Sequence, residues 1–97
     1  MTSDTDSTAG TPDVPVKILV LQRGWVAIGR HAKDGTEHVL TDASIVRRWG
    51  TSKGLGQLAA GGVTAATVLD KVGTIRAHEL ATVLVIDCDA QVWGTSL

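Results

Sequence analysis

The apolar residues of this chain are grouped in short runs rich in valine, isoleucine and leucine, which glycine and polar residues interrupt. Runs of this length and composition are typical of β-strands. We expect extended segments at Val16–Gln22, Trp25–His31, Glu37–Leu40, Ala43–Trp49, Thr67–Leu69, Thr74–Ala77 and Leu80–Cys88. Because no segment has the apolar period of a long helix, the sequence predicts a chain that folds mainly as a β-sheet.

The connections between these runs predict tight turns and one short helix. Gly35 within Lys33–Thr36 supplies the positive φ of a hairpin turn, and Thr41–Asp42 is expected to form a kink or bulge. A further turn is expected at Lys71–Gly73. Within Gly50–Gly62, three apolar residues have the i, i+3, i+4 spacing of one helical face, which predicts a helix of at most two turns.

The ends of this helix have their own signals. Thr51 or Ser52 is expected to cap its start, and Gly61–Gly62 to end it. Val92–Trp93 is expected to close the domain. Together these features predict a mainly β (α+β) fold, a small twisted antiparallel sheet or open barrel with one short helix.

The first fifteen of the 97 residues differ from the rest. Met1–Pro15 consists almost wholly of Ser, Thr, Asp, Gly and Pro, which predicts a disordered polar tail before a single small β-rich domain over 16–97. Without the three acidic residues of the tail, the domain has a charge of about +2. This charge is too weak for a general grip on duplex nucleic acid. The small size favours a homo-oligomer.

The sequence also bears on location. The N-terminus lacks a basic start followed by an apolar run, and apolar runs such as Ile18–Leu21 are far too short to span a membrane. We therefore expect a cytoplasmic protein with no membrane partner. A single cysteine, Cys88, excludes an intramolecular disulfide.

One segment, Ile45–Ala59, combines the parts of an anion site, and no acidic residue lies between Asp42 and Asp70. Arginine binds phosphate bidentately, an indole stacks on a base, and glycine lets the backbone approach a ligand. Neighbouring arginines on a strand point to opposite faces, so one of them is expected to face the pocket. The candidate ligand-binding residues are Arg47, Arg48, Trp49, Thr51, Ser52, Lys53, Gly54 and Gly56.

The same segment could instead serve only the fold, without binding a ligand. The two arginines could be solvated or paired with Asp34, Asp42 or Asp70, and Trp49 could be the main core residue. The glycines could serve only a strand-to-helix turn.

Arg23-Gly24-Trp25 repeats the combination of a cation, a flexible residue and an indole, and adds Arg23 and Trp25 to the candidate residues. Its alternative is a bulge with Trp25 packed on the core.

Other chemistry finds little support. Gly54, Gly56 and Ala59 fit a dinucleotide-binding pattern, but the helix is too short for that fold. The three histidines are scattered, so we expect no metal site. Cys88 lies late in an apolar strand and is expected to be a buried hydrophobe. We expect no catalytic residues and no cofactor.

Three motifs resemble a family of small proteins encoded by tailed bacteriophages and prophages. They are Arg23-Gly24-Trp25, the segment Ile45–Ala59, and Thr67–Thr74, and the resemblance covers roughly Lys17 to Asp89. It implies a location in the host cytoplasm. By analogy, several phage proteins of this size are oligomeric sponges that sequester nucleotide immune signals of the host.

The leading hypothesis is a non-catalytic, homo-oligomeric protein that sequesters a small anionic ligand such as a nucleotide or cyclic nucleotide. One alternative is a phage structural or assembly protein, or an inhibitor of a host protein, with Trp25, Arg47 and Trp49 as interface anchors. A weaker alternative is a small enzyme that cleaves nucleotides.

Overall fold

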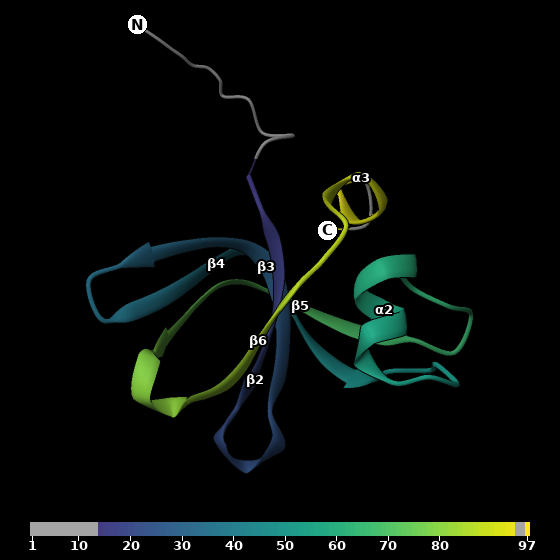
Figure 1. Ribbon diagram of the computed structural model, residues 1–97, viewed down its shortest axis with the longest axis horizontal. Helices are drawn as coiled ribbons and strands as arrows, with labels where there is room; N and C mark the ends of the chain where they lie inside the picture. Colours follow the sequence, from purple (N-terminus) through teal and green to yellow (C-terminus); the bar gives the residue numbers. More distant parts are fainter. Residues whose placement is uncertain (1–13, 95–96) are drawn as a thin grey trace, which may run out of the picture.

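The computed structural model describes residues 14–94 and 97, and it is built on one antiparallel sheet of five strands in the order β5-β4-β3-β2-β6 (Figure 1). The strands are β2 (Val16–Leu21), β3 (Val26–Asp34), β4 (Glu37–Arg48), β5 (Val68–His78) and β6 (Thr82–Asp87). The first four form a meander, and β6 returns to the free side of β2. The sheet stays open, with β5 and β6 as its edges, which confirms the predicted fold class in its open form.

Two tight turns connect the first three strands. Gly35 has φ 59° in the hairpin turn between β3 and β4, as predicted. Between β2 and β3, the 3-10 turn η2 (Gln22–Gly24) holds Arg23 at φ 68° and Gly24 at φ 80°. Two successive left-handed residues reverse the chain within a few positions, and the Leu21 amide then donates to the Trp25 carbonyl oxygen at 2.7 Å.

The sheet has a buried cluster on each face. Alternation along the strands separates Ile18 and Ile28 on one face from Leu19 and Ala27 on the other, and all four are fully buried. The first face is covered by two short helices, α2 (Leu55–Gly61) and α3 (Ala90–Trp93). The second cluster continues onto β4 through Leu40 and Ala43.

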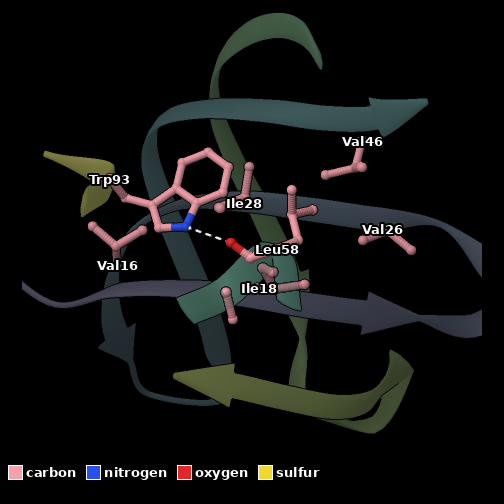
Figure 2. Packing of buried hydrophobic residues seen from close by; sticks show 8 residues of the cluster. Val16, Ile18, Val26, Ile28, Val46, Leu58 and Trp93 are labelled. Carbon is pink, nitrogen blue, oxygen red and sulfur yellow. Dashed lines mark hydrogen bonds between the residues drawn. The ribbon is translucent and has the colours of Figure 1, made fainter. Parts of the chain in front are cut away.

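Trp93 is the largest fully buried side chain of the first cluster (Figure 2). Its indole is fully buried, and Nε1 donates to the Leu58 carbonyl oxygen at 3.0 Å. This bond ties α3 to α2 above the strands, so the expectation that Val92–Trp93 closes the domain is confirmed. The sequence did not predict that these residues are helical.

The predicted kink at Thr41–Asp42 is present. Asp42 has φ 48°, and the pairing of β4 with both of its neighbours shifts register here. The predicted turn at Lys71–Gly73 is wrong, because β5 continues through it. Gly73 takes φ 87° inside the strand, opposite Ala43, where the β4–β5 register shifts. The glycine therefore belongs to a bulge and not to a chain reversal.

Two further boundaries differ from the prediction. The strand expected from Leu80 begins only at Thr82, because Glu79–Ala81 form the 3-10 turn η3. The helix begins at Leu55, with Gly54 and no side-chain cap before it. The expected polar tail lies outside the described residues except for its last two, of which Pro15 accepts a hydrogen bond from the His31 amide at 2.8 Å.

Candidate functional site

A hollow of about 450 Å³ lies where the start of β3, the end of β4 and the start of β5 meet. It is lined by Gly24, Trp25, Val26, Ile45, Val46, Arg47 and Asp70. Two of the segments singled out in the sequence, Arg23–Trp25 and Ile45–Ala59, thus contribute to one surface although they are separated in the chain. The volume is in the usual range for a small-molecule site.

Strand pairing explains why these segments meet. Ala27 is the partner of Ile45 in the β3–β4 ladder, so extending the antiparallel register by two residues sets Trp25 opposite Arg47. On the other side of β4, Ile45 is the partner of Asp70. Alternation gives Ile45 and Arg47 the same face, which is the face of the Ala27 cluster, away from α2 and α3.

Arg47 and Asp70 form a bidentate ion pair at the edge of the hollow. Nε of Arg47 donates to Oδ2 at 2.9 Å, and Nη2 donates to Oδ1 at 3.0 Å. These hydrogen bonds raise the pKa of Arg47 and lower the pKa of Asp70. Both oxygens of Asp70 accept from Arg47, whereas Nη1 and one N–H of Nη2 donate to no residue in the described part of the chain. The pair fixes the plane of the arginine and leaves its outer edge open to a ligand.

Both indoles of the candidate site are exposed. Trp25 is 58% exposed and Trp49 is 42% exposed, so the interpretation of Trp49 as the main core residue is wrong and that place belongs to Trp93. The alternative that packs Trp25 on the core is wrong for the same reason. An exposed tryptophan presents a large apolar face to a ligand or a partner.

Arg48, Trp49 and Lys53 do not line the hollow. Arg48 ends β4 with an exposed side chain, at a shift in the β4–β5 register. Lys53 is exposed in the loop before α2.

Thr51 and Ser52 hold the loop before α2 in shape. Oγ1 of Thr51 donates to the Gly54 carbonyl oxygen at 2.8 Å. Oγ of Ser52 and the Lys53 amide both donate to Oε1 of Gln57, at 3.3 and 2.9 Å. Neither hydroxyl caps the helix as expected, because Thr51 bonds within the loop and Ser52 bonds to a side chain of α2.

The glycines of this loop divide into two kinds. A Cβ on Gly50 would lie 2.3 Å from the Ala66 carbonyl carbon, so this residue permits a close approach of two loops. Gly54 has φ 81° with open space around it, and Gly56 lies within α2, also in open space. With seven residues, α2 is too short to supply a helix-terminus anion site.

Arg23 is placed in the β2–β3 turn and is exposed, next to Gly24 and Trp25 of the hollow without lining it. Asp70 lines the hollow, but the sequence suggested it only as a possible ion-pair partner of the arginines. It is the first acidic residue after a long segment without acidic residues, and this position could have marked it as part of the site. Ile45, an apolar residue of the lining, had no signal beyond its strand position.

Other reactive groups lie outside this hollow. Cys88 is a free thiol whose pKa is raised to about 12 by burial and by the nearby Asp87 charge, so it is protonated at neutral pH. Among residues 14–94 and 97, no three His, Cys, Asp or Glu side chains are grouped as metal ligands would be. None of the helices in that part of the chain is long and apolar enough to cross a membrane.

No protein-family model and no curated protein matches this sequence, so a function has to be inferred from the arrangement of the side chains described above.

Proposed function

We propose that this is a non-catalytic binding protein for a small anion that carries a flat ring, and that the ligand lies in the hollow between Trp25 and Arg47. A nucleotide, cyclic nucleotides included, combines both features. The observation that carries this proposal is the meeting of two distant segments, each with an arginine and a tryptophan, at one hollow.

The guanidinium of Arg47 is suited to hold the anion. Asp70 occupies one edge of it and so orients the other edge, where two N–H groups of Nη1 and one of Nη2 can bind phosphate oxygens. The side chain of Arg47 is about two-thirds exposed (67%), so a ligand reaches it without opening the fold. The Asp70 charge offsets part of the attraction for phosphate. Affinity therefore has to come from a second group as well.

Trp25 supplies that second group. A base stacked on an exposed indole gains about 1–3 kcal/mol, and this gain tolerates different bases because each has a flat face. Ile45 adds an apolar residue to the lining of the hollow.

A protein that binds a ligand without converting it removes one ligand molecule per binding site. The amount of ligand removed therefore depends on the number of protein copies and on their affinity. The protonated Cys88 thiol, with its raised pKa, supports this reading over a cysteine nucleophile. The resemblance to phage proteins supports a nucleotide immune signal of the host as the ligand. Sequestration of such a signal is the function we propose.

Calorimetry with a panel of linear and cyclic nucleotides tests the proposal. We expect heat of binding for at least one nucleotide and recovery of the intact ligand after the complex is heated. Arg47→Ala and Trp25→Ala should each weaken binding at least tenfold. Arg76→Ala is the matched control, because Arg76 is an exposed arginine paired with Asp34 and Glu37 at the other end of β5.

Two results contradict the proposal. Absence of heat with every nucleotide at millimolar concentration excludes the ligand class. An equal effect of R47A and R76A excludes the hollow as the site, since a general change in charge would then explain the loss.

A second candidate function is binding of a host or phage protein. The exposed indoles of Trp25 and Trp49 favour it, because exposed tryptophans are typical anchors of protein interfaces. A stable complex with a defined protein that is lost in W25A and W49A, together with no nucleotide binding, would favour this candidate.

A further inference from the structure

The outer edge of β6 is an uncharged, apolar strand edge without a neighbour in the described part of the chain. Leu80, Val83, Leu84 and Val85 are between 41% and 81% exposed. From Leu80 to Ile86 the sequence contains no charge, proline or glycine. Proteins usually protect a free edge with such residues, because an unprotected edge pairs with another strand.

The opposite edge of the sheet is protected in this way. β5 carries Lys71 and Arg76, both exposed, and Gly73 bends it with a φ of 87° at a register shift. Exposed charge discourages pairing with a further strand. The contrast in charge between the two edges singles out β6 as the one adapted to a partner, although β6 also has a register shift, at Val83.

The backbone of β6 has groups ready for that pairing. The Cys88 amide donates to the Val16 carbonyl oxygen at 2.9 Å, so alternation turns the peptide groups of Ile86 and Leu84 toward β2. The N–H and C=O groups of Val85 then face outward, and Val83 lies at a register shift between Leu84 and Thr82. A second strand laid antiparallel would bond to the outward groups of Val85.

We propose that the partner is a second copy of this chain, paired through β6 about a two-fold axis at Leu84. A two-fold axis perpendicular to the sheet makes one residue its own partner. With Leu84 opposite Leu84 of the partner subunit, Val83 of each copy meets Val85 of the other, and the outward N–H and C=O groups of each Val85 bond across the interface. Thr82 meets Ile86 in the same register.

The distribution of charge along β6 favours a second copy of the chain as the partner, and it favours antiparallel pairing. The antiparallel register carries the two Asp87 carboxylates to opposite ends of the new ladder, whereas parallel pairing would bring them side by side. Each Asp87 stays 3.4 Å from Lys17 of its own chain. Every paired residue is uncharged, so the edge is complementary to itself and offers nothing to select a charged partner.

The dimer leaves the hollow accessible. The hollow is formed by the β3, β4 and β5 side of the sheet, and the dimer edge lies beyond β2. Each dimer would therefore present two separate hollows, and loss of dimerisation is distinguishable from loss of ligand binding.

Light scattering during size exclusion, at micromolar concentrations of the full chain, measures the expected doubled mass. Leu84→Lys places two ammonium groups at the axis and should give monomers, and so should Leu84→Glu. Mixing the L84K and L84E chains should restore the dimer, because opposite charges then meet. Val72→Lys is the control on β5, where the native side chain is similarly exposed (50%), and it should remain dimeric.

Circular dichroism on each variant separates an interface effect from a folding effect. A wild-type monomer at hundreds of micromolar overturns the proposal. So does a dimer that survives in L84K, or a mixture of folded L84K and L84E chains that stays monomeric.

Discussion

Trp93 Nε1 lies 3.0 Å from the Leu58 carbonyl oxygen, and neither residue has exposed surface. Trp93→Phe keeps much of the bulk but leaves a buried carbonyl without its donor, which costs about 1–3 kcal/mol. Trp93→Ala also leaves a cavity and should cost about 3–5 kcal/mol. Urea unfolding measures both changes. Trp25→Phe is the control, since this exposed site should change stability by less than about 0.5 kcal/mol, and equal stability of W93F and W25F would contradict the role of this bond.

Gly50 and Gly54 should respond differently to alanine. Both have positive φ, of 70° and 81°, so each substitution strains the backbone by about 1–3 kcal/mol. Only at Gly50 would the new Cβ also overlap backbone, lying 2.3 Å from the Ala66 carbonyl carbon. We expect Gly50→Ala to destabilise the protein by about 1–3 kcal/mol more than Gly54→Ala, as overpacking does. Thermal unfolding compares them, and a larger loss in G54A would show that the close approach of the two loops is not maintained in solution.

The strand content could be predicted because the β-branched runs and the turn residue Gly35 are local signals. The bulge at Gly73 could not be separated from a turn, since both use glycine at positive φ and only the partner strand decides between them. The burial of Trp93 likewise depends on contacts between segments that are distant in the sequence. Three tryptophans in one small chain give no local indication of which is buried, and the answer depends on α2 and α3 meeting over the sheet.

The candidate site was predicted in part. Arg47 and Trp25 could be proposed from their sequence neighbours, but their meeting depends on the register of β3 with β4, which short segments do not specify. The role of Ser52 was missed, because the side chain of Gln57 reaches back from α2 to the loop and accepts its hydroxyl; the hydroxyl of Thr51 bonds to the Gly54 carbonyl oxygen instead.

His31 should make stability depend on pH. The rings of His31 and His38 share a hydrogen bond of 2.9 Å, and burial, followed by the charges of Lys17, His38 and Lys33, lowers the pKa of His31 below 6.5. Asp87 opposes this shift. Because the unfolded chain then binds more protons than the folded one below pH 6.5, the free energy of unfolding should fall as pH falls from there toward the lowered pKa.

Urea unfolding between pH 7.5 and 5.5 measures this dependence, whose slope for one proton is at most about 1.4 kcal/mol per pH unit. His31→Gln should flatten the curve. His78→Gln is the control, because His78 is exposed and accepts a hydrogen bond from the Leu80 amide away from the pair. If the slope is unchanged in H31Q but reduced in H78Q, His31 is not the source of the pH dependence and the prediction is wrong.

Cys88 should be inert in the folded protein and reactive in the unfolded one. Burial, reinforced by the Asp87 charge, raises its pKa from 9.0 to about 12, so almost no thiolate exists at pH 8. We expect an aromatic disulfide reagent to label native protein slowly at pH 8 and to label it fully in concentrated urea. W93F should speed native labelling, since Cys88 packs against the cluster that contains Trp93.

The same shift predicts a loss of stability in alkali. The folded protein retains the Cys88 proton where the unfolded chain has released it, so this contribution is complete below pH 9 and is lost progressively as pH rises toward 12. Cys88→Ala removes the titrating group and should flatten the curve of unfolding free energy between pH 8 and 10, provided that the variant is as folded as the wild type by circular dichroism. Rapid labelling of the native protein at pH 8, with the same alkaline slope in C88A, would mean that the thiol is open to solvent.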